Sequence, residues 1–271
     1  MRLRVTLSLE KPLFLPLNYQ DKLTGVVYAF LERANPEYAR FLHDDGYPLP
    51  GECGAKRFKL FCFSPLLCAR RRIEEGALRL GPGTAEWLIA SPLEEFLVEF
   101  AGGLMAMDEL HVGREVLPIA GAETLPAPAF GSPLDPPFGA KARFAEARFA
   151  EARFKCLSPI VAATASAGRD TPDYLRPWDA RLGEHLRRNL VNKYAALHGK
   201  FPADERLCVT FDDEYLKTHR GTKLICYKGT EVVGSFAPLT LCGSTALIET
   251  AYDCGLGEKN AAGFGMIEVL K

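Results

Sequence analysis

The sequence predicts an α+β protein in which two similar units follow one another along the chain. Residues 2–9 alternate polar and apolar side chains, which is the period of a half-buried strand. Residues 23–31 carry apolar side chains at helical spacing. Together with the later patterns, these give the order βαββαβ in the first half and the same outline in the second, as in the ferredoxin-like fold. We therefore expect two tandem ferredoxin-like domains, at residues 1–120 and 153–271.

Local patterns define the elements of the first half. The first strand is expected to turn one set of side chains inward and leave the other on a polar face: Leu3, Val5, Leu7 and Leu9 inward, Arg2, Arg4, Thr6 and Ser8 outward. Asn18 is the expected N-cap of the first helix. The further elements expected are a short helix at 36–42, strands at 59–67, 84–90 and 110–119, and a helix that begins at Pro92.

A proline-rich stretch separates the two halves. Residues 121–152 are expected to be a linker or an insert because prolines interrupt them and periodicity is almost absent. The prolines near this stretch are Pro118, Pro126, Pro128, Pro133, Pro136 and Pro137. A five-residue tandem repeat, ARFAE, covers 142–154. Because a period of five fits neither a helix nor a strand, its phenylalanines cannot all face one core.

The second half repeats the outline of the first. The expected elements are a strand at 154–163, a helix at 179–197, a strand pair at 206–211 and 223–227, a short strand at 237–241, a helix at 244–254 and a last strand at 264–270. One face of the long helix is apolar and comprises Leu182, Leu186, Leu190, Tyr194 and Leu197.

Composition excludes several classes of protein. With 271 residues, 48% of them hydrophobic, the chain can bury a proper core. A formal net charge of −1 excludes coating of nucleic acid by bulk charge, so contacts with RNA would need local basic patches. The eight cysteines form no Cys-x-x-Cys pair, and we interpret them as buried reduced thiols. Neither a signal peptide nor a membrane-length apolar run is present, which favours a cytoplasmic protein.

Four glycines crowd the last twenty residues, in the segment GLGEKNAAGFG. They are Gly255, Gly257, Gly263 and Gly265. We interpret them as sites of ligand approach rather than of packing, since glycine admits positive φ and consecutive backbone N–H groups can cradle an anion. A simpler reading is a tight connection before the last strand. A dinucleotide fingerprint fails because its third glycine is replaced by Asn260, and no Gly-Lys-Ser/Thr closes a Walker loop.

The segment GLGEKNAAGFGM near the C-terminus resembles the glycine-rich loop of the CRISPR-associated repeat endoribonucleases, which cut precursor CRISPR RNA into guides. The opening of the chain is also similar to that family, with its first strand, its LPLNY entry into a helix and its Tyr-to-His spacing. The likeness is specific at both ends and covers the middle only by the order of elements. It implies tandem ferredoxin-like domains and CRISPR repeat RNA as the partner. Subunits of a guide-RNA effector complex and a second copy of the chain are further candidate partners.

The resemblance implies a metal-independent endoribonuclease that uses no cofactor. Attack of the 2′-hydroxyl on the adjacent phosphate would leave a 2′,3′-cyclic phosphate and a 5′-hydroxyl. Such cleavage needs a base, an acid for the leaving oxygen and positive charge near the phosphate. The family supplies these with Tyr, His and Lys, which fall on Tyr28, His43 and Lys59 of this sequence, with Lys56 as the rival to Lys59.

Each of these residues also has a structural reading. His43 could be a helix C-terminal histidine that interacts with the helix dipole. Imidazole, however, titrates near ~6.5 and can exchange a proton at neutral pH. The neighbouring Asp44 and Asp45 would favour its protonated form and hence a role as the acid. Tyr28 could be a boundary core aromatic or could orient the 2′-hydroxyl, since an ordinary tyrosine is a poor base. Lys59 could simply begin a strand. The remaining histidines, which lack clustered ligands, are expected at the surface: His111, His185, His198 and His219.

Binding of RNA is expected from the glycine-rich loop and from basic side chains. Lys259 and Asn260 stand at the expected tip of the loop, and the long helix of the second half carries Arg187, Arg188 and Lys193. The helical residues could equally form a solvated face. The triplet Arg70–Arg72 is a second basic candidate.

Two rival functions remain open at this point. One is a non-catalytic RNA-binding subunit of a guide complex, which would have the same fold and loop but would not cut. The other is a small-molecule enzyme on a ferredoxin-like scaffold.

Overall fold

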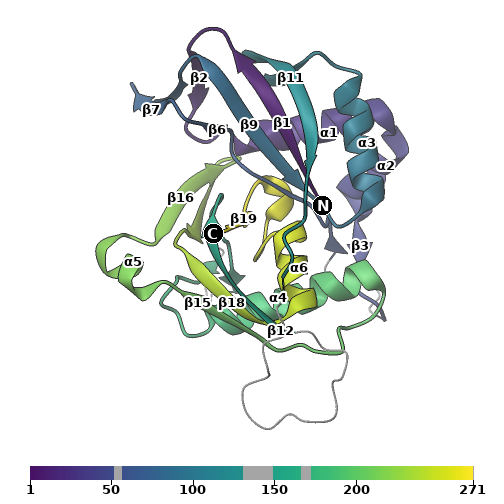
Figure 1. The fold of residues 1–271 in the computed structure, drawn as a ribbon, viewed down its shortest axis with the longest axis vertical. Helices are drawn as coiled ribbons and strands as arrows, with labels where there is room; N and C mark the ends of the chain where they lie inside the picture. Colours follow the sequence, from purple (N-terminus) through teal and green to yellow (C-terminus); the bar gives the residue numbers. More distant parts are fainter. Residues whose placement is uncertain (52–56, 131–148, 166–171, 271) are drawn as a thin grey trace.

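The computed structural model describes residues 1–51, 57–130, 149–165 and 172–270. It consists of two ferredoxin-like units that lie one above the other in Figure 1, with the C-terminal segment between them. Lys56 and residues 142–148 of the tandem repeat lie outside the described residues. The strand β12 (Phe149–Cys156) of the second unit includes residues 149–152 of the expected linker, and the last strand of the first unit runs to Leu125, beyond the expected boundary at 120. The domain boundaries themselves stay a prediction.

The first unit is built on an antiparallel sheet. Its strands are β1 (Arg2–Leu9), β5 (Cys62–Phe63), β6 (Leu67–Cys68), β9 (Gly83–Ala90), β10 (Glu109–Val112) and β11 (Glu115–Leu125). The order is β10-β11-β1-β9-β5, with β6 also paired to β9. The strand expected at 59–67 is wrong in extent, because Leu60 has a positive φ of 52° and Pro65 interrupts the backbone. The strand expected at 110–119 is a hairpin that turns at Gly113.

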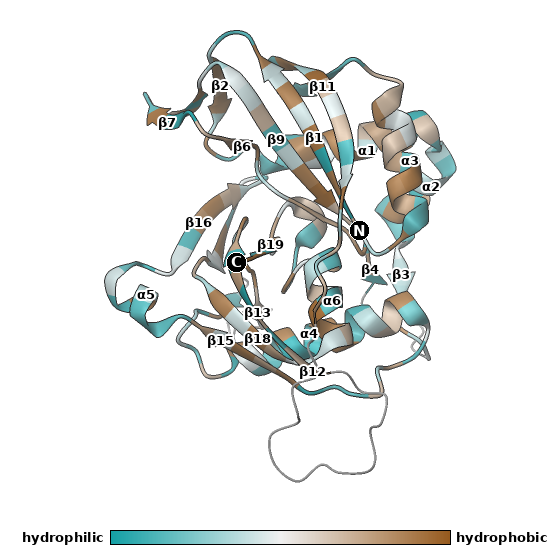
Figure 2. Cartoon of the chain, viewed as in Figure 1, coloured by the Kyte–Doolittle hydropathy of each residue, from teal (hydrophilic) through white to brown (hydrophobic). Residues whose placement is uncertain are grey.

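Helices cover one face of this sheet. They are α1 (Gln20–Ala34), α2 (Pro36–Arg40), the π-helical turn η1 (Phe41–Asp45) and α3 (Glu94–Met105). The apolar faces of α1 and α3 meet the inward side chains of β1 in one core. Figure 2 shows the alternation of hydrophobic and hydrophilic residues along β1, whereas the end of β9 is continuously hydrophobic. A separate three-stranded sheet joins β2 (Leu13–Pro16) to the hairpin of β7 (Arg71–Glu74) and β8 (Ala77–Leu80). The short strands β3 (Tyr47–Pro48) and β4 (Arg57–Phe58) pair with each other.

The second unit repeats the arrangement. Its sheet has the order β15-β18-β12-β19, formed by β12 (Phe149–Cys156), β15 (Leu207–Phe211), β18 (Leu239–Ser244) and β19 (Ile267–Val269). Two helices, α4 (Leu182–His198) and α6 (Thr245–Cys254), contribute to its core. The order in each unit, with the fourth strand beside the first and the third beside the second, is that of the ferredoxin-like fold. The prediction from the order of elements is confirmed.

An insertion lies between β15 and β18. It contains α5 (Asp213–Thr218) and a hairpin of β16 (Thr222–Tyr227) and β17 (Thr230–Ser235). The strand pair expected at 206–211 and 223–227 is therefore wrong, since β15 pairs with β18 and β16 pairs with β17. The short pair β13 (Ala163–Thr164) and β14 (Asp173–Tyr174) and the 3₁₀ turn η2 (Asn260–Ala262) complete the described elements.

Contacts between the units overturn two expectations. Arg2 does not lie on a solvated face, because the second unit covers it: its side chain is only 2% exposed, and Nη2 donates to the carbonyl oxygens of Tyr252 and Ile267 at 2.7 and 2.6 Å. Asn18 is not the N-cap of α1, which is Tyr19. The Asn18 side chain instead accepts a hydrogen bond from the Cys226 amide of the inserted hairpin at 3.1 Å.

The cysteines are less uniformly buried than expected. Cys62 and Cys254 are buried at the boundary between the units, whereas Cys208 and Cys226 are exposed. Within the described residues, no helix is both long and apolar enough to cross a membrane.

The closest approach of α1 and α3 depends on one glycine. A Cβ at Gly103 would lie 1.9 Å from the carbonyl oxygen of Phe30, whereas a Cβ at the neighbouring Gly102 would make an ordinary contact of 3.6 Å with Ala34. Gly103→Ala must push the helices apart, so we expect it to lower the free energy of unfolding by about 3 kcal/mol. Urea denaturation measures the change.

The matched control is Gly102→Ala, at an exposed position of the same helix. It should stabilise the protein by about 0.5–1 kcal/mol because alanine has the higher helix propensity. Equal effects of the two substitutions would contradict the close-approach argument.

Candidate active site

The three residues expected to act in catalysis come together in one pocket. Tyr28 projects from α1, His43 from the π-helical turn η1, and Lys59 follows the short strand β4. Lys59 Nζ donates to the Tyr28 hydroxyl at 2.9 Å and to the His43 carbonyl oxygen at 2.8 Å. The rings of Tyr28 and His43 meet edge to face with centroids 5.3 Å apart. The pocket has a volume of about 350 Å³ and is also lined by the glycine-rich loop.

Proton exchange at His43 is constrained by its neighbour. Its Nδ1 lies 2.7 Å from Asp44 Oδ1, and its side chain is 67% exposed. An acceptor at Nδ1 favours a proton on that nitrogen, so Nε2 is the ring nitrogen that can exchange a proton with a substrate. A π-helical turn such as η1 is rare and often marks a functional site.

Burial shifts the pKa values of the other two groups. It raises the pKa of the Tyr28 hydroxyl far above its ordinary value, and Tyr227 and Asp44 raise it further. Tyr28 is therefore a neutral hydrogen-bonding group at physiological pH and a poor general base. The pKa of the Lys59 ammonium group is lowered, mainly by burial. The positive charge of Lys228 lowers this pKa further, and the negative charge of Asp44 partly offsets the shift.

The glycine-rich loop, defined here as residues 255–265, is folded around a buried lysine. Lys193 of α4 is only 3% exposed. Its Nζ donates to the carbonyl oxygens of Gly255 and Gly257 at 2.6 and 2.8 Å and to Asn260 Oδ1 at 2.7 Å. These contacts use the three donors of the ammonium group. Lys193 therefore organises the loop from inside, which the sequence did not predict. It also lines the pocket, and its contact with RNA stays a prediction.

The glycines of the loop also serve packing, so the expectation that they only admit a ligand is wrong. A Cβ at Gly257 would lie 2.3 Å from the Val161 carbonyl oxygen, and one at Gly263 would lie 2.7 Å from the Phe63 ring of the first unit. Each of the four glycines has a positive φ, as expected. Several of the loop's backbone N–H groups bond within the second unit, among them those of Glu258 to Val161 and of Gly265 to Pro159.

Asn260 does not stand at the tip of the loop. It is 8% exposed, and its Nδ2 donates to the carbonyl oxygens of Leu256 and Phe264 while its Oδ1 accepts from Lys193. Lys259 is exposed at the pocket, as expected, with a left-handed φ of 58°.

A polar stripe on α4 faces the loop beside the apolar one. It consists of His185, Asn189 and Lys193, spaced four residues apart. His185 is not a plain surface group, because its Nε2 lies 3.1 Å from Glu258 Oε1 of the loop. Asn189 is 5% exposed and lines the pocket. The four-residue spacing of these polar side chains is a signal that the sequence contained, but sequence reasoning used only the apolar stripe.

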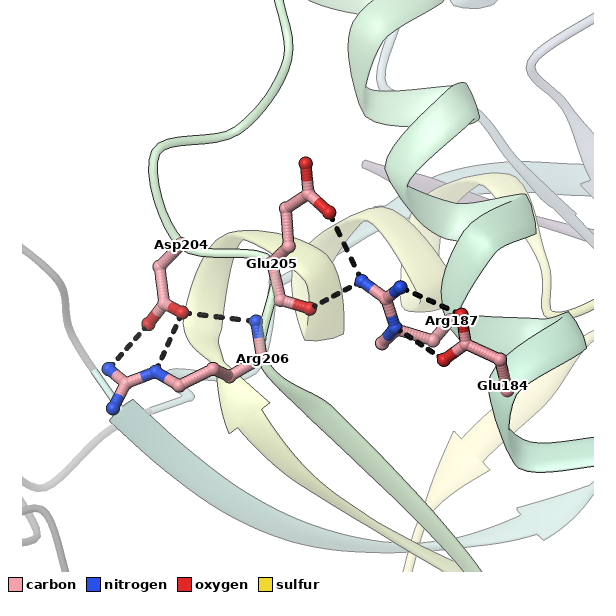
Figure 3. A network of polar contacts seen from close by, with 5 residues as sticks. All are labelled: Glu184, Arg187, Asp204, Glu205 and Arg206. Carbon is pink, nitrogen blue, oxygen red and sulfur yellow. Dashed lines mark hydrogen bonds and ion pairs between the residues drawn. The ribbon is translucent and has the colours of Figure 1, made fainter.

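The two arginines expected to bind RNA lie elsewhere on α4. Arg187 is held by Glu184 and Glu205, with Nε 2.7 Å from Glu184 Oε2 and Nη1 3.1 Å from Glu205 Oε2. Figure 3 shows this network beside the neighbouring pair of Asp204 and Arg206. Arg187 lines a different cavity, so the structure does not bring it to the pocket. Arg188 is exposed on the same helix, and its contact with RNA stays a prediction.

Positive charge gathers at the pocket despite the near-neutral chain. Its lining contains one carboxylate, Glu258, and five cationic side chains: Arg57, Lys59, Lys193, Lys228 and Lys259. A second, larger cavity of about 1160 Å³ is lined by Arg71 and Arg72 of the expected basic triplet. No group of three or more His, Cys, Asp or Glu side chains that could hold a metal ion occurs among the described residues.

Removal of the Lys193 charge tests its role as the centre of the loop. Lys193→Met keeps an apolar stem but leaves three buried acceptors without their donor, so we expect the free energy of unfolding to fall by about 3 kcal/mol in urea denaturation. Arg188→Met, on an exposed face of the same helix, should change it by less than about 0.5 kcal/mol. Equal stability of the two variants would contradict this assignment.

Comparison with known proteins places the chain in a family. Residues 144–269 match the model of "CRISPR associated protein Cas6, C-terminal", and residues 14–120 match that of "CRISPR-associated protein Cas6, N-terminal". The chain is 29% identical over 270 residues to the "CRISPR-associated endoribonuclease Cas6 1" of Methanocaldococcus jannaschii, covering 98% of this chain and 92% of that protein. It is 23% identical to the "CRISPR-associated endoribonuclease Cas6" of Pyrococcus furiosus, covering 94% and 83%.

Solved structures of other proteins share the fold of this chain. One described as "CRISPR associated protein Cas6" superposes with a TM-score of 0.74 at 27% identity, covering 100% of this chain and 99% of that chain. One described as "Characterization of a Cas6-related gene from Pyrococcus furiosus" gives a TM-score of 0.79 at 19% identity, covering 100% and 98%. Since both halves of the chain match the family and a relative aligns with it almost end to end, the chain belongs to the CRISPR-associated Cas6 family.

Proposed function

We propose that this chain is an endoribonuclease that binds CRISPR repeat RNA and cleaves precursor CRISPR RNA by attack of a 2′-hydroxyl. The observation that carries the proposal is the pocket in which Lys59 contacts Tyr28 and His43 beside the glycine-rich loop. The full-length relative from Methanocaldococcus jannaschii, which bears the name of an endoribonuclease, supports the same reaction class.

Each residue has a role that its surroundings suit. His43 Nε2 gives a proton to the 5′-oxygen as it leaves phosphorus, while Asp44 holds Nδ1. The Lys59 ammonium group can only donate hydrogen bonds. It stabilises the negative charge that builds on the phosphate during the reaction. Tyr28, which stays neutral, orients the 2′-hydroxyl or the phosphate through its O–H. The 2′-hydroxyl proton passes to water at the mouth of the pocket, and the products are a 2′,3′-cyclic phosphate and a 5′-hydroxyl.

RNA beyond the cleavage site has a path of basic side chains. Lys228 lines the catalytic pocket, and Lys223, earlier in the same hairpin, lines the larger cavity with Arg71 and Arg72. We propose that the RNA follows this hairpin from one cavity to the other. Association with effector subunits or with a second copy of the chain remains a prediction.

Cleavage of labelled repeat RNA in EDTA tests the proposal. We expect a single cut that needs no metal, and His43→Ala should slow it by at least about 100-fold while binding is kept. An RNA with a 2′-deoxy sugar at the cut position should remain intact. The control His219→Ala, at the exposed end of α5, should cut normally. Binding without any cut would instead support a non-catalytic RNA-binding subunit, and lack of binding would refute both.

The lowered pKa of Lys59 predicts a pH dependence. A lysine with a lowered pKa loses its charge at a lower pH than an ordinary lysine, whereas an arginine keeps its charge throughout. The ratio of the Lys59→Arg cleavage rate to the wild-type rate should therefore rise with pH on the alkaline side, because other titrating groups cancel in the ratio. The exposed control Lys217→Arg should give a flat ratio. A flat ratio for Lys59→Arg would contradict this prediction.

A further inference from the structure

Backbone strain concentrates at the catalytic pocket. In the described part of the chain, the non-glycine residues with positive φ are Leu60, Glu75, Lys228 and Lys259. All of them except Glu75 line the pocket. Side chains with a Cβ rarely adopt this conformation, and such residues cluster at functional sites, where the surrounding structure holds them.

Lys228 occupies a position at which another residue would be less strained. Together with Gly229 it forms the two-residue turn between the paired residues Tyr227 and Thr230, with φ of 48° and 79° at the two turn positions. Turns with two positive φ angles favour Asn-Gly, because asparagine tolerates the left-handed region. A lysine here therefore costs turn stability and places a cation at the pocket.

Several contacts hold this turn against the first unit and the glycine-rich loop. The Tyr227 hydroxyl lies 3.3 Å from Thr24 Oγ1, which is one turn before Tyr28 on α1. The Tyr227 ring packs edge to face on Phe264 of the glycine-rich loop, with centroids 6.1 Å apart. The Cys226 amide is bonded to Asn18. The hairpin is thus docked where the catalytic residues of the first unit meet the loop of the second.

We propose that Lys228 is a substrate-contacting residue that binds an RNA phosphate in the same pocket as Lys59. This inference rests on the proposed cleavage of repeat RNA. The second unit then contributes the cation of Lys228 to the cleavage reaction, whereas Tyr28, His43 and Lys59 come from the first unit. Lys59 and Lys228 are close enough for their charges to interact, and a phosphate between two such cations would relieve their mutual repulsion.

The chain contains a matched control for this proposal. The hairpin of β7 and β8 also turns through a strained residue and a glycine, Glu75 and Gly76, with φ of 50° and 77°. Asparagine at either turn should relieve strain, so Lys228→Asn and Glu75→Asn should both match or exceed the wild type in stability. Only Lys228→Asn removes a cation from the pocket.

The experiment measures single-turnover cleavage of repeat RNA with saturating enzyme, alongside urea denaturation. Lys228→Asn should slow cleavage by about 10- to 100-fold without loss of stability. Lys228→Arg should retain most of the rate, and Glu75→Asn all of it. A wild-type rate in Lys228→Asn would overturn the proposal, as would an equal loss in Glu75→Asn.

Failure of the proposed function itself would be recognised separately, because the wild type would then not cut. In that case the salt dependence of RNA binding tests whether Lys228 contacts a phosphate. Lys228→Asn should reduce the slope of log affinity against log salt by about 0.7, the amount expected for one phosphate contact with single-stranded RNA, and Glu75→Asn should not. An unchanged slope in Lys228→Asn would overturn the phosphate contact.

Discussion

The arrangement of the site depends on one buried ammonium group. Lys193 donates to the carbonyls of Gly255 and Gly257 and to the side chain of Asn260, so the glycine-rich loop closes around a cation. A buried charge is tolerated only when its hydrogen-bonding groups are satisfied, and these acceptors satisfy it. The loop is thereby fixed to α4, and its outer surface is held beside Tyr28 and His43. The glycines permit this fold because a Cβ at any of them would collide with neighbouring atoms.

The pocket belongs to neither unit alone. The first unit contributes the groups suited to proton transfer and charge stabilisation, and the second contributes the loop and the inserted hairpin. Gly263 lies against Phe63, and Tyr227 reaches Thr24, so movement of one unit against the other would change the distances within the pocket. The geometry of the chemistry therefore depends on the packing between the units as much as on either core.

Local patterns predicted most of the fold. The alternation in β1 and the apolar stripes of α1, α3 and α4 identified those elements because each buries one face against its own unit. Tyr28, His43 and Lys59 could be named only through family resemblance, since no local pattern links them. Sequence reasoning misplaced Arg2, Asn18 and Lys193 because their partners are distant in the chain and lie across an interface or inside a loop. A polar residue bonded across an interface has the same local pattern as one that faces water.

The burial of Arg2 has a consequence for how the protein is made. Its guanidinium group is hydrogen-bonded to the carbonyls of Tyr252 and Ile267, which a ribosome adds 250 and 265 residues after Arg2. The strands of the first unit's sheet end at Leu125, so that sheet can be complete before the partners of Arg2 are added, and this contact between the units forms after it.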